Sequence, residues 1–139
     1  MLLLPSLLPP TFPFLLVILI ELPPSMLFLF WPDAQLPAPQ PQARALIRQY
    51  AVLLTSVNLI ALIFCVRPVD ETSRLVAGAM AVYQIGPAIR AASRIGRGER
   101  WFEGALGGPL VHLTVHMLCL ASLLRLFSSA DYVKRLARA

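Results

Sequence analysis

Charged residues are scarce in this chain. Aspartate, glutamate, lysine and arginine make up 14% of its 139 residues, whereas hydrophobic residues make up 58%. Soluble domains carry about 25% charged residues. A soluble domain of this length could not bury so much apolar surface, so the composition argues against an ordinary globular protein. It favours a single integral membrane domain over residues 1–139.

Cysteines and basic clusters are also too few to define a site. The two cysteines, Cys65 and Cys119, fall inside apolar runs, and no CxxC or CxxH spacing occurs. This predicts buried, reduced thiols instead of a disulfide framework. No basic stretch is interleaved with aromatic residues, so nucleic acid is not among the expected partners.

Four long apolar runs dominate what the sequence does contain. They predict transmembrane helices near residues 14–31, 45–66, 72–92 and 105–125. Even the shortest run spans about 27 Å as a helix, which is adequate for a hydrocarbon core of about 30 Å. The expected fold is all-α: a four-helix transmembrane bundle with a short basic interfacial helix over residues 126–139.

The residues between and within these runs predict the connections and the irregularities of the helices. Residues 32–42 are rich in proline and glutamine, which predicts an extended, polyproline-like connector. Asp70 is expected to cap the third helix, because its side chain can accept from the first free N–H groups. Small residues between positions 77 and 81 predict that this helix is the packed, interior member of the bundle. Pro87 predicts a kink in it.

The first run has two interpretations. It opens with four prolines up to Pro13, so its helix is expected to begin only after them. A cleaved signal peptide needs a basic n-region, but no lysine or arginine precedes this run and Glu21 interrupts it. The preferred interpretation is a membrane-spanning helix that is irregular at Pro23 and Pro24.

The charges do not orient the chain in the membrane. Six basic residues fall on each expected face, so the positive-inside rule gives no answer. The expected localisation is an integral, multi-pass membrane protein, with the endoplasmic reticulum or another endomembrane favoured. The candidate partners are the lipid bilayer, anionic lipids at the basic tail, an apolar small molecule, and further subunits in a homo- or hetero-oligomer.

Titratable groups at membrane depth are costly and therefore informative. An ionised acid at a helix centre costs roughly 2.5–3.5 kcal/mol on insertion scales, so Glu21 is expected to be protonated, paired or beside water. In an up-and-down bundle, four polar residues lie at one depth, about 12–14 Å from the same face. They are Glu21, Tyr83, Asn58 and His116. The sequence therefore predicts a polar layer in mid-membrane.

The candidate catalytic residues come from this layer. Glu21 would be the proton donor, and His116 or His112 would be the partner base. The two histidines are four residues apart and so share one helix face. Tyr83 would orient an oxygen of the substrate. Two histidines alone do not close a metal site, so neither a metal nor another cofactor is expected.

The candidate ligand-binding residues are amides and a hydroxyl. They are Asn58, Gln84 and Thr55. Their groups can hydrogen-bond to a ligand oxygen. For Asn58 and Thr55 the preferred interpretation is that they form hydrogen bonds that hold neighbouring helices together.

Three short motifs carry a resemblance to known proteins. They are Glu21-Leu22-Pro23, Tyr83-Gln84-Ile85-Gly86-Pro87 and His112-Leu113-Thr114-Val115-His116. With its size and helix number, the chain resembles small four-helix integral membrane proteins of filamentous fungi. Some proteins of that type serve secondary metabolism as epoxide hydrolases or cyclases. The resemblance implies no catalytic residue here, because no catalytic motif of those enzymes occurs.

Three functions remain open from the sequence. The preferred one is non-enzymatic: an accessory or apolar-ligand-binding bundle with a mid-membrane polar layer. The second is a membrane-embedded acid–base enzyme, of the epoxide hydrolase, isomerase or cyclase type, acting on a lipid-soluble metabolite. The third is a subunit of an oligomeric channel or transporter, although the chain lacks the internal repeats usual in transporters.

Overall fold

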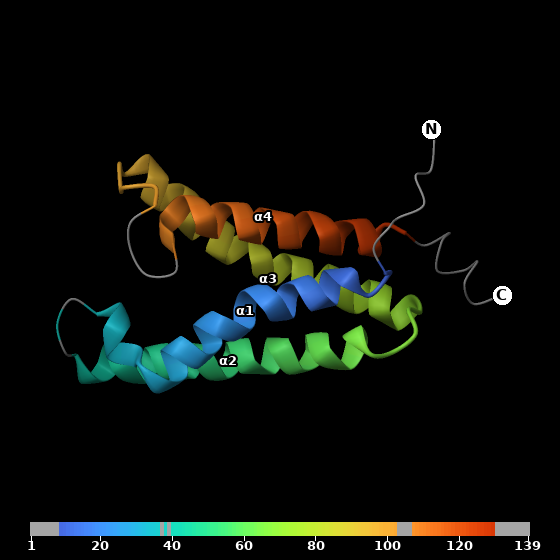
Figure 1. Cartoon of the computed structure of the whole chain (residues 1–139), viewed down its shortest axis with the longest axis horizontal. Coiled ribbons are helices and arrows are strands. Elements are labelled where there is room, and N and C mark those ends of the chain that lie inside the picture. The colour runs from blue at the N-terminus through green and yellow to red at the C-terminus, as the bar shows by residue number, and fades with distance from the viewer. Residues whose placement is uncertain (1–8, 37, 39, 103–106, 130–139) are drawn as a thin grey trace.

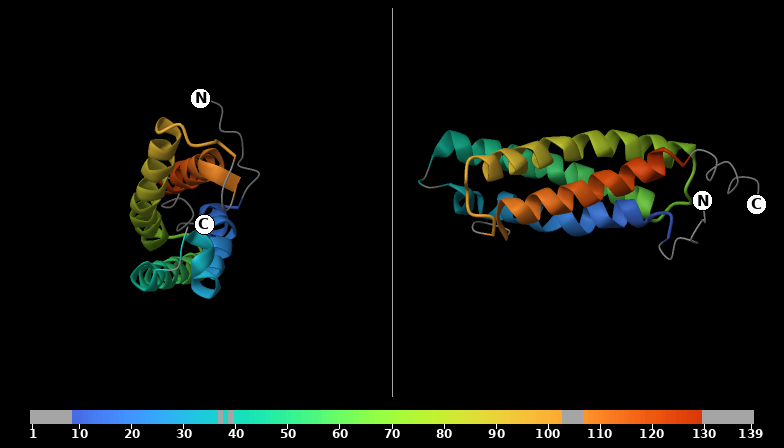
Figure 2. Two further views of the ribbon diagram at one scale, coloured as in Figure 1. Left: turned by 90° about the vertical axis from the view of Figure 1, so that its left-hand side faces the viewer. Right: turned by 90° about the horizontal axis from the view of Figure 1, so that it is seen from above.

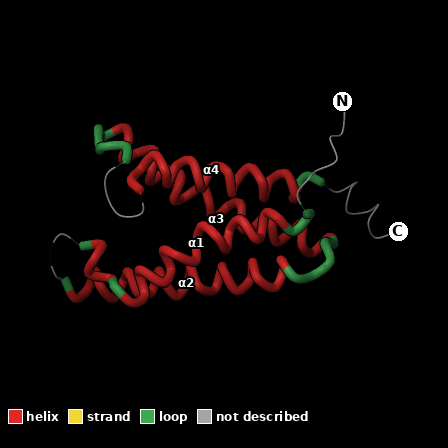
Figure 3. The backbone as a smooth tube through the Cα atoms, viewed as in Figure 1, coloured by secondary structure: helices red, strands yellow, loops and turns green. Residues whose placement is uncertain are grey.

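The computed structural model describes residues 9–36, 38, 40–102 and 107–129. Its elements are α1 (Phe12–Phe30), the 3-10 helix η1 (Pro32–Gln35), α2 (Pro41–Cys65), α3 (Glu71–Gly96) and α4 (Gly108–Phe127). All four α-helices are long and apolar enough to cross a membrane. The expected all-α, four-helix bundle is confirmed, and Figure 3 shows helix broken only by short loops. Residues 130–139 of the expected basic tail lie outside the described residues.

The helices extend beyond the apolar runs that predicted them. α2 begins at Pro41 instead of residue 45, and α3 ends at Gly96 instead of residue 92. Charged residues are tolerated there, because the ends of a membrane helix lie in the polar interface and not in the hydrocarbon. Hydropathy therefore located the spans well and their ends less well.

Proline interrupts the helices less than its chemistry suggested. α1 runs through Pro23 and Pro24, and α3 runs through Pro87. The expected extended connector is also shorter than predicted, because its start forms η1 and Pro41 already belongs to α2. Proline is favoured in the first turn of a helix, where its missing N–H would have had no partner.

The bundle consists of two helical hairpins. α1 packs against α2 and α3 packs against α4, while α1 and α4 make the main contact between the hairpins. Figures 1 and 2 show the helices running along one axis, with the start of α1 and the end of α4 at the same end of the bundle. α3 has the largest buried share of the four, 33% of its apolar window, and it packs mainly on α4.

The apolar core fills only one half of this bundle. All four helices contribute to it, from the half that contains the start of α1 and the end of α4. Its buried members are Phe14, Val17, Ala61, Phe64, Ala77, Met80, Ala81, Cys119, Leu123 and Leu126. Beyond it, toward the loops that follow α1 and α3, the two hairpins diverge in Figure 1.

The start of α3 is fixed by a capping box. Asp70 Oδ1 accepts a hydrogen bond from the backbone N–H of Ser73 at 2.7 Å, and the Ser73 hydroxyl faces the backbone N–H of Asp70 at 3.3 Å. The bond from the Ser73 backbone holds the pKa of Asp70 below its usual value. Asp70 therefore caps the third helix as expected.

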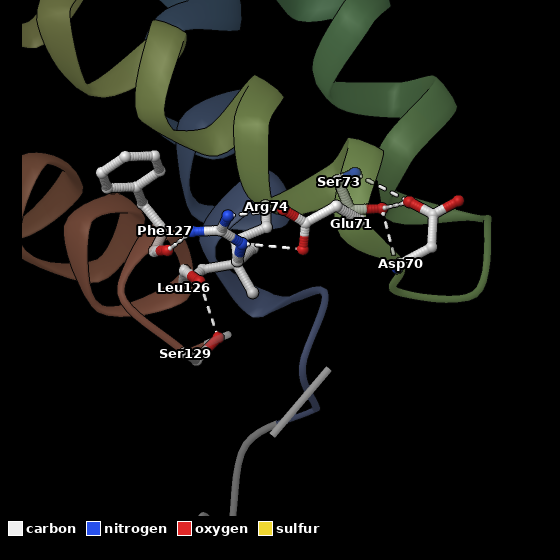
Figure 4. A network of polar contacts seen from close by, with 7 residues as sticks. All are labelled: Asp70, Glu71, Ser73, Arg74, Leu126, Phe127 and Ser129. Atoms are coloured by element: carbon white, nitrogen blue, oxygen red, sulfur yellow. Dashed lines mark hydrogen bonds and ion pairs between the residues drawn. The ribbon is translucent and has the colours of Figure 1, made fainter. Parts of the chain in front are cut away.

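A close contact joins α3 to α4 beside this cap (Figure 4). Arg74 Nη1 donates to the carbonyl oxygen of Phe127 at 2.6 Å, and its guanidinium lies 5.3 Å from the centre of the Phe127 ring. Gly78 faces the same ring so closely that a Cβ atom there would come within 2.6 Å of Phe127 Cδ2. The small residue at position 78 thus permits the ring to pack flat on α3.

The Gly78→Ala variant tests this contact. We expect it to be less stable than Gly86→Ala by about 1–3 kcal/mol, because the added methyl group displaces the Phe127 ring. At Gly86 nothing lies within 4 Å of an added Cβ, so alanine there should only improve helix propensity. Reversible unfolding in mixed micelles measures both variants. Adding Phe127→Ala should remove most of the difference; equal stability of the two single variants would contradict the contact.

Candidate functional site

A chain of polar contacts crosses the bundle at mid-depth and takes residues from all four helices. Gln84 Oε1 accepts from His116 Nδ1 at 2.7 Å, and Gln84 Nε2 donates to Glu21 Oε1 at 3.3 Å. On the other carboxyl oxygen of Glu21, the Tyr83 hydroxyl lies at 3.5 Å. The Tyr83 hydroxyl in turn lies 3.2 Å from that of Tyr50. The order is therefore His116, Gln84, Glu21, Tyr83, Tyr50.

The central members of this polar chain are buried. Gln84 is 0% exposed, Glu21 2% and His116 7%. Glu21 lies nine residues before the end of α1, about 13 Å along the helix. A buried polar group without a hydrogen bond is costly, which is why three helices meet around this one carboxyl group.

Gln84 stands between the acid and the histidine. The sequence predicted that Glu21 would pair directly with His116 or His112. Glu21 Oε1 and His116 Nδ1 are 3.5 Å apart, while the shorter bond of His116 goes to Gln84. Because the Gln84 carbonyl can only accept, the proton of His116 lies on Nδ1 and Nε2 keeps its lone pair.

The other candidate residues lie outside this polar chain. His112 is one turn before His116, with 6.3 Å between the ring centres. Thr55 and Asn58 donate to carbonyl oxygens of their own helix, those of Ala51 and Leu54, each at 2.9 Å. Neither of these two residues lines the cavities described below. Tyr50, eight residues before Asn58 on α2, makes the contact from that helix instead.

A cavity of about 870 Å³ lies between the hairpins, in the half of the bundle that the apolar core leaves unfilled. At mid-depth its wall includes Glu21, Tyr83, His112 and His116. Its lining also includes apolar side chains, among them Phe28, Leu53 and Leu54, together with Gly86. The volume is within the range of about 300–1,000 Å³ that small-molecule sites occupy.

A second, smaller cavity of about 280 Å³ adjoins the same polar residues from the α1–α4 side. It is lined by Pro23 and Pro24 together with Glu21 and His116. The rings of the two prolines free backbone carbonyls in the preceding turn of α1, which gives this wall extra acceptors. Glu21 and His116 therefore border both cavities.

The outer end of the larger cavity is basic. Arg94 Nε donates to Glu99 Oε2 at 2.6 Å, and Arg97 Nη2 donates to Glu99 Oε1 at 3.0 Å. The hydrogen bond from Arg94 holds the pKa of Glu99 below its usual value, so this acid stays ionised at neutral pH. Arg90 lines the same region one turn deeper along α3.

Tyr50 and Gly86 are the site residues that sequence reasoning missed. A tyrosine near the end of a membrane helix usually marks the interface, so Tyr50 carried no signal of its own. With α2 beginning at Pro41, Tyr50 lies nine residues into the helix, at a depth similar to that of Glu21. Gly86 stood within a motif, but nothing in the sequence indicated that it borders a cavity.

The arrangement can bind an oxygen-bearing apolar molecule and exchange protons with it. Glu21 and the Tyr83 hydroxyl can donate to an oxygen, and Nε2 of His116 can accept a proton. Among the described residues, no group of three or more histidine, cysteine, aspartate and glutamate side chains has the geometry to hold a metal ion.

Comparison with known family models, with curated proteins and with solved structures finds no match to this chain. The resemblance to small fungal membrane proteins therefore stays a prediction.

The Gln84→Leu variant tests the central link. Leucine has a similar volume but leaves Glu21 and His116 without their shared partner, so we expect a loss of about 1–3 kcal/mol in the free energy of unfolding. Unfolding in mixed micelles measures it. Replacing Glu21, Gln84 and His116 together by leucine should cost less than the sum of the three single changes, because no polar group is then left unpaired. A silent Gln84→Leu would refute the link.

Proposed function

We propose that this multi-pass membrane protein binds a lipid-soluble small molecule in the cavity between its two hairpins. The observation that carries the proposal is the cavity of about 870 Å³, which lies among membrane-spanning helices and reaches Glu21, Tyr83 and His116. The apolar side chains of the cavity would contact the apolar part of the ligand, and the polar residues at the inner end of the cavity would hydrogen-bond to an oxygen of the ligand.

The incomplete packing of the bundle supports this proposal. Membrane helices associate through close packing, so an unfilled space of this size sacrifices contacts that apolar side chains could have made. The same space is bordered by buried polar groups, which are expensive to maintain at membrane depth. A ligand that fills the cavity would restore the contacts and use the polar groups.

The Gly86→Phe variant tests ligand binding. Residue 86 borders the cavity, and an added Cβ atom meets nothing within 4 Å, so the phenyl ring can enter the space without displacing the backbone. The probe is 1-dodecanol, and native mass spectrometry of the full chain measures the bound fraction. We expect at least a roughly tenfold weaker binding, equivalent to about 1.4 kcal/mol, because the ring occupies the ligand's space.

Gly96→Phe is the matched control. Gly96 is also on α3 and also open to an added Cβ atom, but it borders neither of the two cavities. It should bind 1-dodecanol as the unmodified chain does. Equal binding by Gly86→Phe and the unmodified chain would show that the probe lies elsewhere.

A second function, acid–base catalysis, is favoured by one specific observation. Glu21, Tyr83 and His116 border one cavity, and Gln84 holds His116 with Nε2 as its proton acceptor. In epoxide hydrolysis, neutral Glu21 would protonate the epoxide oxygen as the carbon–oxygen bond breaks. Water would attack the carbon and lose its proton to His116. A proton must then return from His116 to Glu21 before the next turnover.

Glu21→Gln distinguishes catalysis from binding alone. The amide keeps the shape of the side chain and removes the transferable proton, so hydrolysis of 1,2-epoxydodecane to its diol should fall by about 10²–10⁴-fold. Binding of 1-dodecanol should change little. Glu71→Gln, an exposed change at the opposite end of the bundle, should leave the rate unchanged. Diol formation that is absent from the unmodified chain, or unaffected by Glu21→Gln, rejects this function.

A further inference from the structure

At the outer end of the larger cavity, one cation has no acidic partner among the described residues. Arg94 and Arg97 share Glu99, but Arg90 forms no ion pair with any residue that the structure describes. Its side chain is exposed and borders the cavity from α3. Among the described residues that line this end, the basic groups exceed the acidic ones, so together they carry net positive charge.

A second donor borders the same cavity from the opposite hairpin. Gln35, in η1, lines the cavity, and its side-chain Nε2 is buried with no hydrogen-bond partner among the described residues. Buried polar groups are nearly always hydrogen-bonded, so an orphaned donor needs an explanation. An acceptor oxygen held between η1 and α3 would supply one.

We infer that the bound molecule is an anionic amphiphile, whose carboxylate or phosphate head is held by Arg90 and Gln35 while its apolar chain lies along the cavity toward Glu21. The inference rests on the proposed ligand-binding function and names the class of ligand. Arginine and an amide N–H both suit the oxygens of such a head. The position of Arg90 near the end of α3 also suits a charged head group, because the head then stays at the membrane interface while the apolar chain enters the membrane.

The geometry also orients the ligand. Arg90 lies six residues before the end of α3 and Tyr83 lies seven residues earlier, about 10 Å further along the helix. A chain that begins at Arg90 therefore reaches the polar residues at mid-depth after roughly eight methylene groups. An oxygen at or near that point of the chain could bond to Glu21, Tyr83 or His116.

The experiment compares four probes on the full chain by native mass spectrometry. They are dodecanoate, dodecyl phosphate, 1-dodecanol and inorganic phosphate. We expect at least one of the two anionic amphiphiles to bind about tenfold more tightly than 1-dodecanol, as a charge-assisted hydrogen bond predicts. If only dodecanoate binds more tightly than 1-dodecanol, the head group is a carboxylate. If only dodecyl phosphate does so, the head group is a phosphate. Arg90→Gln should remove the gain and leave 1-dodecanol binding unchanged.

Arg48→Gln is the matched control. Arg48 is exposed at the same end of the bundle, on α2, and does not line either described cavity, so this change should preserve the gain. The inference is overturned if 1-dodecanol binds as tightly as both anions, or if Arg90→Gln and Arg48→Gln act alike. It is also overturned if inorganic phosphate displaces dodecyl phosphate at equal concentration. If Gly86→Phe still blocks 1-dodecanol in these cases, the binding function stands without the head-group site.

Discussion

A buried carboxyl group on α1 constrains the rest of this bundle. In hydrocarbon no water can satisfy it, so partners must come from the neighbouring helices. α3 supplies two of them from consecutive positions, Tyr83 and Gln84, whose side chains point about 100° apart. One of these residues leads to Tyr50 on α2 and the other to His116 on α4. A single acid thereby sets the rotation of α3 and the level at which the hairpins meet.

The polar residues also divide the bundle into two unlike halves. In the half that contains the start of α1 and the end of α4, small and large apolar side chains pack tightly, with Ala77 and Ala81 on α3 allowing close approach. On the other side, the hairpins diverge around a cavity with a basic outer end. Glu21 lies at the boundary between these two halves. There its carboxyl group has fixed hydrogen-bond partners and also borders the proposed ligand site. The apolar half supplies the rigidity that a site in the other half requires.

The sequence predicted the spans well because each depends on a single local property, the length of an apolar run. It also predicted the Asp70 cap, which is decided within four residues. What it could not predict depends on rotation between helices. Gln84 was named as a ligand-binding residue and proved to link Glu21 to His116, and Tyr50 was not named at all. Helix ends were harder to predict, because the polar interface tolerates charged residues. The effect of proline was also harder to predict, because α1 and α3 continue through their internal prolines.

The position of the loops has a mechanical consequence. Residues 66–70 are the only covalent connection between the hairpins, and they lie at the packed end of the bundle. The two hairpins are therefore joined at one end of the bundle and are not joined covalently at the other end. α2 has 25 residues and is about 37 Å long, so a rotation of about 5° at the joined end moves the free tips by about 3 Å. The stiffness of the joined end, where the apolar core takes side chains from both hairpins, then controls how wide the far end can open.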